Sequence, residues 1–422
     1  MTRSTDCLDG EKLASRLFAT RAVSQALAAP LSSEDQCAQA TEDASPTKWH
    51  LAHTTWFFER FLLEPHQPGY TCFDARFNYC FNSYYETLGA RQPRAKRGLL
   101  TRPSAHEVRA WRAHVDQALH RLFSAPLADQ PEIARLLEIG IQHEQQHQEL
   151  LMTDILALFA PNPLRPAWRE ASILPAGKEI ALTWSGFAGG MAQMGHAGEG
   201  FAFDNETPRH DVLLTPFHLA NRLVTNAEWR AFMEDGGYDA PTLWLADGWA
   251  RAVAEGWHAP LYWERQEGVW LHMTLHGLQL VDPDAPVCHI SYYEADAFAR
   301  WVGKRLPREA EWEHAVTHAP QMENAPPAGL FYPRAARGEG GLEQMFGAVW
   351  QWTQSPYTPY PGYRAAPGAI GEYNGKFMVS QQVLRGSSCV TPEGHSRITY
   401  RNFFYPWQRW QFTGLRLAED AR

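Results

Sequence analysis

The segment from Pro131 to Leu151 constrains the fold of this chain most strongly, because it carries a long helical pattern. Apolar and histidine side chains recur along one side of it, at Ile133, Leu136, Leu137, His143, His147, Leu150 and Leu151. Residues four apart in a helix project from the same face, with Cβ atoms about 5–6 Å apart. His143 and His147 are therefore spaced to hold one divalent metal ion.

Three further helices are expected before this segment. Their starts are indicated near residue 10, at Ser45-Pro46, and at Ser104 with Glu107, where the residue types are those that cap helices. Together with the helix that begins at Pro131, they predict a four-helix bundle over residues 1–160. Residues 66–103 interrupt the bundle as a long ordered loop rich in Tyr, Asn, Arg, Gly and Pro, a kind of segment usually kept for function.

The second half of the chain has a different texture. A proline-marked connector over residues 161–178 leads to short alternating segments with many glycine turns in residues 179–422. One clear helix is expected there, around Tyr292 to Val302. The predicted fold class is thus α+β with two domains, a helical one followed by a mixed one.

Composition excludes several classes of function. The formal charge of −9 argues against a nucleic-acid partner, since phosphate binding needs clustered Lys and Arg. No apolar run approaches the length of a membrane span, and the first residues lack the apolar core of a signal peptide. The 6 cysteines are scattered without a C-x-x-C pair, which fits a reducing compartment. A cytoplasmic protein with small-molecule partners is expected, and its oligomeric state stays open.

A mononuclear metal site needs at least a third protein ligand beside His143 and His147. In a bundle that ligand comes from a facing helix, and His53 lies on the apolar face of the predicted second helix. His50, three residues earlier, is the alternative. Three neutral imidazoles suit zinc, iron or copper almost equally, so the ligand types do not choose the metal.

Two other classes of function compete at this point. The letters H-E-x-x-H spell the zinc-hydrolase pattern, with Glu144 as its general base. No third ligand pattern follows downstream, however, and Gln146 instead offers an amide for a substrate imidazole or carbonyl. The third class is a non-catalytic, lectin-like binding module in which the histidines are structural.

Six segments of the chain, taken in order, resemble the ergothioneine-biosynthesis sulfoxide synthases (EgtB). They are residues 48–59, 81–86, 143–154, 204–210, 286–313 and 400–417. The resemblance covers essentially the whole chain. It implies an N-terminal DinB-like four-helix bundle and a C-terminal domain similar to formylglycine-generating enzymes and sulfatase-modifying factors, with a C-type-lectin-like core.

The family uses iron(II) and O2 to join a sulfur donor to C2 of the imidazole ring of hercynine, the Nα-trimethyl betaine of histidine. The resemblance implies the iron ligands His53, His143 and His147. It also implies that Gln146 hydrogen-bonds the hercynine imidazole, and that the other end of hercynine is surrounded by Tyr373, Asn402 and Phe403. Aromatic faces suit a quaternary ammonium group, which has no hydrogen to donate.

A tyrosine near the iron acts in the family as a proton and electron relay. In one branch it precedes the segment that here begins at Glu372, but this chain has Ile370 near that place. Another branch uses paired tyrosines of the N-terminal loop, which Tyr84 and Tyr85 match. The resemblance therefore implies that one of these two phenols is catalytic, with the choice between them open.

The sulfur donor is the least determined part. Members that accept γ-glutamylcysteine place an acid and a base where this chain has Phe404 and Gln408, and uncharged side chains cannot pair with the extra charged groups of that dipeptide. Cysteine is the smaller thiol, and its carboxylate can bind Arg91, Arg94 or Arg97.

A sister group, the selenoneine synthases (SenA), resembles EgtB closely. These enzymes attach selenium from a selenosugar to the same hercynine. The segments from Gly347 to Trp352 and from Gly386 to Cys389 depart from the commoner EgtB forms. The sequence therefore leaves cysteine and a selenosugar both open as the donor.

Overall fold

The computed structural model of the chain describes residues 10–123, 130–170, 177–198, 200–319 and 329–421. The chain divides into two compact units, Met1–Leu164 and Arg165–Arg422, and each is described by itself. Within the described residues, none of the helices combines the length and the hydrophobicity that a transmembrane span requires.

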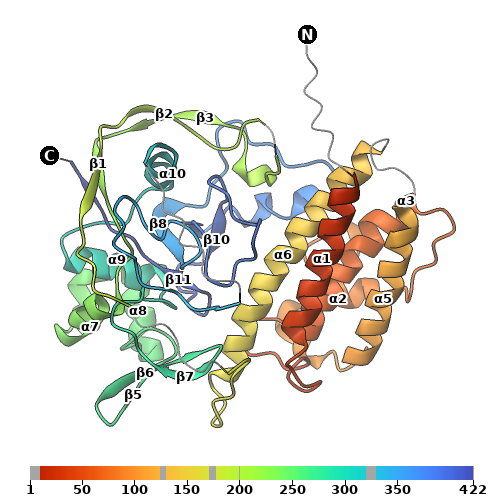
Figure 1. Cartoon of the computed structure of the whole chain (residues 1–422), viewed down its shortest axis with the longest axis horizontal. Helices are drawn as coiled ribbons and strands as arrows, with labels where there is room; N and C mark the ends of the chain where they lie inside the picture. Colours follow the sequence, from red (N-terminus) through yellow and green to blue (C-terminus); the bar gives the residue numbers. More distant parts are fainter. Residues whose placement is uncertain (1–9, 124–129, 171–176, 199, 320–328, 422) are drawn as a thin grey trace. The chain divides into compact units, whose positions relative to one another are not determined.

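The first unit is a bundle built on α1 (Gly10–Ala28), α2 (Thr47–Phe58), α5 (Ala105–Leu122) and α6 (Pro131–Phe159), as predicted (Figure 1). Helix α6 packs against α1 and α2, and α2 also packs against α5. All 12 residues of α2 are buried, so this helix is the centre of the unit. Side chains on α2 and α6 therefore meet away from bulk water.

The predicted helix starts are confirmed at α5 and α6 and shifted by one residue at α2. At α5, the Ser104 hydroxyl accepts from the Glu107 amide, and the Glu107 carboxylate accepts from the Ser104 amide. Helix α6 begins at Pro131. The N-cap position of α2 is Pro46 rather than Ser45. The Ser45 hydroxyl accepts from Arg97 Nη1 at 2.9 Å instead of from a helix amide, and the Ser45 backbone N–H donates to Asp154 Oδ2 on α6 at 2.8 Å.

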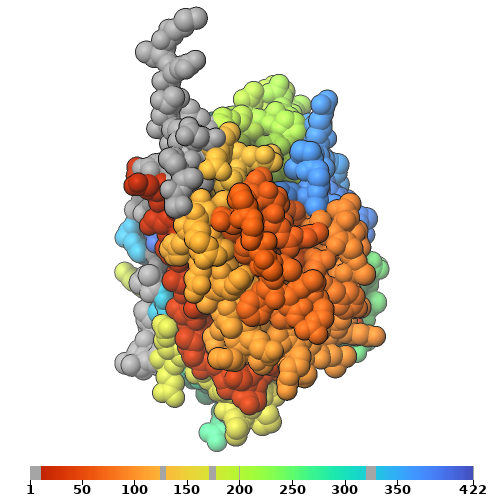
Figure 2. All heavy atoms as spheres, turned by 90° about the vertical axis from the view of Figure 1, so that its right-hand side faces the viewer, coloured from red at the N-terminus to blue at the C-terminus, as the bar shows by residue number. Residues whose placement is uncertain are grey.

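Helix α2 continues through η1 (Glu59–Leu63), a π-helical turn, into α3 (Glu64–His66). Such turns are frequent at functional sites. The following segment, predicted as a loop, contains only the short elements α4 (Phe77–Phe81), η2 (Glu86–Leu88) and η3 (Arg94–Leu99). The orange atoms of this part of the chain form a closely packed surface in Figure 2.

The second unit contains small sheets. One has the strand order β1 (Trp184–Phe187), β4 (Phe217–Ala220), β12 (Ala418–Asp420), and another pairs β2 (Gly190–Met194) with β3 (His210–Leu214). A meander comprises β5 (Trp263–Gln266), β6 (Val269–Thr274) and β7 (Gly277–Leu280). The fourth has the order β10 (Asn402–Phe404), β9 (Gln382–Arg385), β8 (Trp350–Pro356), β11 (Thr413–Gly414), in which only β11 and β8 are parallel.

The helices of this unit are more numerous than the sequence indicated. The predicted one is α9 (Tyr292–Trp301), which ends one residue before the expected Val302. The described residues also include α7 (Asn226–Glu234), α8 (Ala246–Glu255), α10 (Glu309–His318) and the 3₁₀ turns η5 (Asp204–Glu206), η6 (Pro241–Leu243), η7 (Ala369–Glu372) and η8 (Gly375–Phe377). The three α-helices are only 9 or 10 residues long and the 3₁₀ turns only 3 or 4, so their periodicity is too short to stand out in the sequence.

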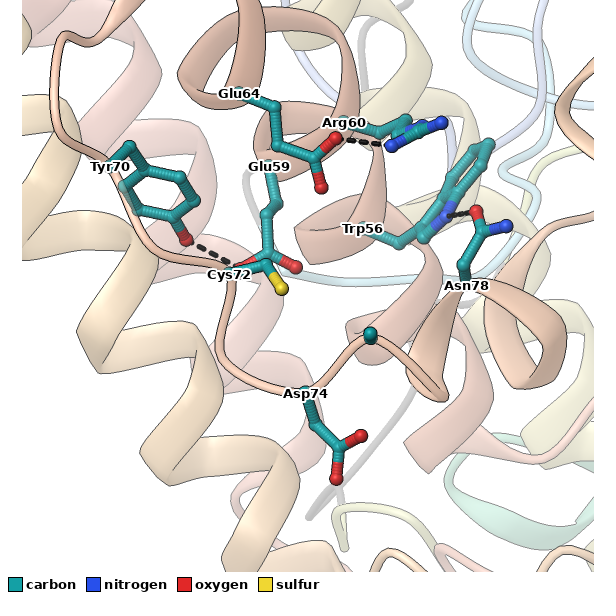
Figure 3. A pocket seen from close by; sticks show the side chains of 9 residues that line it. Trp56, Glu59, Arg60, Glu64, Tyr70, Cys72, Asp74 and Asn78 are labelled. Carbon is teal, nitrogen blue, oxygen red and sulfur yellow. Dashed lines mark hydrogen bonds and ion pairs between the residues drawn. The ribbon is translucent and has the colours of Figure 1, made fainter.

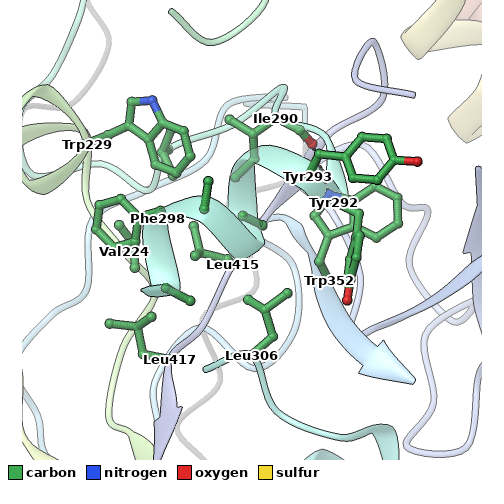
Figure 4. Packing of buried hydrophobic residues seen from close by; sticks show 14 of the residues in the cluster. Val224, Trp229, Ile290, Tyr292, Tyr293, Phe298, Leu306, Trp352, Leu415 and Leu417 are labelled. Carbon is green, nitrogen blue, oxygen red and sulfur yellow. Dashed lines mark hydrogen bonds between the residues drawn. The ribbon is translucent and has the colours of Figure 1, made fainter. Parts of the chain in front are cut away.

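Aromatic residues fill the core of the second unit (Figure 4). Trp229 of α7 stacks on Phe298 of α9, with ring centroids 5.1 Å apart, and Trp352 of β8 lies in the same cluster with Leu415 and Leu417. Several of the tryptophans of the chain thus pack in this core. Strand β10, which carries Asn402 and Phe403, pairs with β9 at the edge of the four-stranded sheet.

Candidate metal site

His53 of α2 and His143 and His147 of α6 converge on one point. Each offers a ring nitrogen, and these three atoms all lie within 4.8 Å of one another. The ring centroids are 4.7 to 4.9 Å apart. Within the described ranges, no other group of three or more His, Cys, Asp or Glu side chains is arranged to hold a metal ion.

The three rings are held neutral by their surroundings. His53 and His143 are buried and His147 is partly exposed. Burial lowers the pKa of His143 to about 4. Burial, together with the neighbouring His143, also places the pKa of His53 and of His147 well below the usual value. Neutral imidazoles keep the lone pairs that a metal needs, so protons do not compete for the site near pH 7.

The orientation of His53 is fixed on three sides. Its Nδ1 lies 2.6 Å from the carbonyl oxygen of Phe81. Because a carbonyl only accepts, Nδ1 carries the hydrogen and Nε2 keeps its lone pair. The ring is also stacked between Trp49 and Trp56, at centroid distances of 4.6 and 5.4 Å and interplanar angles of 14°.

His143 supplies the observation that tests the fit to a metal. Its Nδ1 is buried and has no hydrogen-bond partner among the described residues. A buried polar atom without a partner is costly and calls for one. Three converging neutral imidazoles, one of them with such an atom, fit a divalent metal that prefers nitrogen ligands, such as iron, zinc or copper.

His50, the alternative third ligand, lies outside this group. Its Nδ1 is 2.9 Å from Nδ1 of His147, and its Nε2 is 3.0 Å from Asp154 Oδ2. His50 therefore bridges a proposed ligand and a carboxylate. Neither this bridge nor Asp154 was predicted from the sequence, although Asp154 follows His147 by seven residues on the same helix face.

Glu144, the general base in the hydrolase interpretation, forms ion pairs within the bundle. It is fully buried and pairs with Arg112 of α5 and with Arg21 of α1. Burial alone raises the pKa of Glu144, but the two guanidinium groups outweigh it and lower that pKa below its ordinary value. Its carboxylate thus holds three helices together, which removes the base that a zinc hydrolase requires.

The loop arginines gather around Tyr84. Arg94 Nη1 donates to the Tyr84 hydroxyl at 2.9 Å. Burial raises the pKa of Tyr84, but Arg94, Arg97 and Arg91 outweigh it and lower that pKa below its usual value. The structure therefore brings the three predicted arginines and one predicted tyrosine into a single positively charged cluster.

Arg97 connects this cluster to the histidines. It donates to the hydroxyls of Ser45 and Ser83, each at 2.9 Å, and its guanidinium lies 3.4 Å from the centroid of the Trp49 ring. Trp49 in turn stacks on His53. Burial lowers the pKa of Arg97 to about 9, and no carboxylate forms an ion pair with it in the described part of the chain.

The two tyrosines differ in environment. Tyr85 is buried, and its ring packs against Trp56 and Phe61 at centroid distances of 5.5 and 5.3 Å. Tyr84 is only partly buried and has its hydroxyl among the arginines. Gln146 is also partly exposed and lies beside His147 on α6, as its place in the sequence requires.

A pocket of about 440 Å³ lies in the same unit, and Trp56, one of the two indoles stacked on His53, lines it (Figure 3). Its carboxylates already have partners. Glu59 accepts from the Tyr70 hydroxyl and from the Phe73 amide, and Glu64 pairs with Arg60. The pocket is therefore not a second metal site of this unit.

In the second unit, two of the predicted hercynine contacts belong to one aromatic cluster. Phe403 stacks on Tyr357 with centroids 4.1 Å apart and an interplanar angle of 10°. Phe377 contacts both Phe403 and Tyr373, at 6.0 and 5.9 Å. Tyr357 and Phe377 were not predicted, because only the fold brings them to Phe403. The Asn402 side-chain oxygen accepts from the Phe403 amide at 2.9 Å.

The two positions that bear on the donor are uncharged and take part in packing. Phe404 contacts Trp410, with ring centroids 5.9 Å apart, and packs against the hydrophobic core. Gln408 is buried, and its side-chain oxygen accepts from the Tyr405 amide at 3.0 Å.

Comparison with known proteins accounts for both units. Residues 16–151 match the DinB superfamily. Residues 183–327 and 319–421 match the sulfatase-modifying factor enzyme 1-like domain. The formylglycine-generating enzyme of Streptomyces coelicolor is 30% identical over 63% of this chain and 97% of its own length. The two matches are the bundle and the mixed domain that the sequence predicted.

Two relatives match along nearly the entire chain. The hercynine oxygenase of Mycolicibacterium thermoresistibile is 34% identical over 89% of this chain and 88% of its own length. That of Mycobacterium tuberculosis is 33% identical over 91% of this chain and 93% of its own length. With both domains present in the same order, the chain belongs to the hercynine oxygenase (EgtB) family.

Proposed function

We propose that this chain is an iron(II)- and O2-dependent enzyme that joins the sulfur of cysteine to C2 of the hercynine imidazole and leaves a sulfoxide. The observation that carries the proposal is the convergence of three neutral imidazoles in a chain whose relatives are hercynine oxygenases. The buried Arg112–Glu144 pair speaks against the hydrolase alternative.

His53, His143 and His147 would hold the iron. When bound, a ferrous ion supplies the one-electron redox chemistry that O2 requires to react with a closed-shell substrate. The protein contributes a site that needs no proton release at neutral pH, since the pKa of each ring is lowered. Trp49 and Trp56 hold the His53 ring in place.

Hercynine would be bound at its two ends by different chemistry. Gln146, beside His147, offers an amide that can hydrogen-bond the imidazole and orient C2. The trimethylammonium group would lie against Tyr373 and Phe403, where cation–π attraction is worth about 0.5–2 kcal/mol. Behind this face the buried Tyr357 stacks on Phe403, and Phe377 contacts both Phe403 and Tyr373. Asn402 would bind the carboxylate.

Tyr84 is the better candidate for the phenol that transfers a proton and an electron. Its hydroxyl accepts a hydrogen bond from Arg94, and the arginine cluster lowers its pKa, so its Oη proton is released more easily than that of an ordinary tyrosine. Tyr85 packs its ring among aromatic side chains instead.

The charge of the loop supports cysteine over a selenosugar as the donor. Arg91, Arg94 and Arg97 bring three guanidinium groups together around Tyr84, and among the described residues no carboxylate forms an ion pair with the buried Arg97, whose side chain donates to Ser45 and Ser83. A buried cation without a counter-charge favours an anionic ligand. Cysteine brings a carboxylate, whereas a neutral sugar brings none.

Anaerobic reconstitution tests the proposal. The protein is loaded with iron(II), mixed with hercynine and one donor, and exposed to O2, and the products are identified by mass. The donors are cysteine, γ-glutamylcysteine and a selenosugar in separate reactions. We expect the cysteine sulfoxide adduct with O2 consumption. No loss of hercynine with any donor would refute the enzymatic proposal, and a product from the selenosugar alone would refute the choice of donor.

A further inference from the structure

A line of polar contacts leads from the start of α2 to the proposed iron ligand His147. The Ser45 amide donates to Asp154 Oδ2 at 2.8 Å. The same oxygen lies 3.0 Å from Nε2 of His50, and Nδ1 of His50 lies 2.9 Å from Nδ1 of His147. His50 and Asp154 are 3% and 7% exposed, so water does not compete effectively for these contacts.

The positions of the hydrogens follow from the partners. The contact between His50 and Asp154 needs a hydrogen on Nε2, because a carboxylate only accepts. Nδ1 of His50 is then available as an acceptor, and a hydrogen on Nδ1 of His147 donated to it accounts for the 2.9 Å contact. His147 is thereby left with its lone pair on Nε2. The opposite arrangement would put a hydrogen on Nε2 of His147 and prevent that atom from binding a metal.

His147 is the proposed ligand whose ring is confined least by aromatic packing. His53 is stacked between two indoles, and His143 packs on Phe57 at a centroid distance of 4.8 Å. His147 is the partly exposed ligand, and its contact with an indole, that of Trp49, is tilted by 49° at 6.1 Å. Aromatic packing confines His147 less than His53, so a hydrogen bond has to set its rotation.

We propose that His50 and Asp154 are positioning residues that fix the tautomer and rotation of His147, so that its Nε2 faces the metal. Asp154 orients His50, His50 accepts from Nδ1 of His147, and the Ser45 amide holds Asp154. The inference rests on the proposed function, since it concerns a metal held by His53, His143 and His147. Outer partners of metal-binding histidines generally act in this way, and their loss costs about 10–100-fold in affinity or activity.

The competing explanation is that the contacts only hold α2 against α6. Variants of the full-length chain separate the two. His50→Phe keeps a ring of similar size and removes both nitrogens. His50→Asn places an amide oxygen close to the position of Nδ1 and so keeps the acceptor for His147. Gln148→Leu is the matched control, because Gln148 follows His147 but donates to the Thr20 carbonyl oxygen and the Ser24 hydroxyl of α1, at 2.7 and 2.9 Å.

Cobalt(II) is the probe, because it binds imidazole nitrogen and its visible spectrum reports the geometry of its ligands. Its affinity for the metal-free protein is measured by competition with a chelator, and stability is measured by urea unfolding of the same samples. We expect His50→Phe to lower the affinity by about 10–100-fold and to alter the spectrum. His50→Asn should recover most of the affinity. Gln148→Leu should lower stability and leave both affinity and spectrum unchanged.

The outcomes distinguish this inference from the proposed function. If the wild-type chain does not bind cobalt(II), the metal site itself fails. If the wild type binds and His50→Phe binds equally well with the same spectrum, the positioning role is refuted while the metal site stands. Should His50→Phe not fold, Asp154→Asn carries the test, because it keeps the shape of the side chain and removes its charge. Wild-type affinity in that variant would refute the inference.

Discussion

Arg21 of α1 and Glu144 of α6 form a buried ion pair, with 3.2 Å between Nη1 and Oε2. Arg112 of α5 binds the other oxygen of the same carboxylate. The glutamate of the H-E-x-x-H pattern is thus the point at which three helices of the bundle are joined. A motif that suggests a hydrolytic base is here part of the scaffold that positions the histidines.

Glu144→Gln is therefore expected to destabilise the first unit. The substitution leaves the buried Arg112 without its ion-pair partner, whereas Arg21 keeps Asp116, and breaking a buried pair in this way costs about 3–5 kcal/mol. Urea unfolding followed by circular dichroism measures the change. A variant of unchanged stability that had lost a hydrolytic activity would support the hydrolase alternative instead.

Each of His53→Ala, His143→Ala and His147→Ala should abolish retention of iron(II). Removing a ligand from a three-nitrogen site should cost more than the roughly 10–100-fold seen when an outer partner is lost. Metal content after gel filtration under anaerobic conditions provides the measurement. His106→Ala, an exposed histidine of α5, is the control and should keep wild-type iron. Full iron content in any of the three variants would remove that residue from the ligand set.

Tyr84→Phe should lower the rate of sulfoxide formation or divert the reaction to other products. Loss of a positioned proton donor typically costs about 10²–10⁴-fold in rate. Tyr85→Phe should have little effect, because the Tyr85 ring packs against Trp56 and Phe61, and phenylalanine preserves that packing. The products of both variants are identified by mass and compared with those of the wild type. A large effect of Tyr85→Phe and a small one of Tyr84→Phe would assign the relay to Tyr85 instead.

Arg94→Gln should raise KM for cysteine and leave KM for hercynine unchanged. A hydrogen bond to a charged group contributes about 1.5–3 kcal/mol, which corresponds to about a 10–100-fold change. Glutamine can still donate to Tyr84, so the effect should fall on KM rather than on kcat. Arg102→Gln, at an exposed position of the same loop, is the control. An equal rise in both KM values would argue for a general role of the loop rather than donor binding.

Acid should destabilise the second unit, and His272 should account for part of the effect. Burial lowers the pKa of His272 to about 4, against about 6.5 in an unfolded chain. Between these values the unfolded state binds a proton that the folded state does not, so stability is lost as the pH falls from about 6.5 to 4. The loss expected from this residue is about 3 kcal/mol. Urea unfolding at several pH values should show a shallower slope in His272→Gln, and an unchanged slope would contradict the assignment.

The local order of residues determined much of this protein. Helical geometry places residues three and four apart on the same face, so some features can be predicted from one helix alone. They are the spacing of His143 and His147 on α6, the capping box of Ser104 with Glu107, and the start of α6 at Pro131. The resemblance along the whole chain predicted the order of the two domains and the protein family, and the relatives confirm the family.

The tertiary structure decided which side chains meet. His50 and His53 lie one turn apart on the same helix, and only the rotation of α2 against α6 makes one face the other histidines and the other bridge His147 to Asp154. Glu144 pairs with arginines 123 and 32 residues away, and Phe403 stacks on Tyr357, which directly follows β8. These contacts depend on how the surfaces of different elements pack against one another. The periodicity of residues within one segment carries no information about that packing.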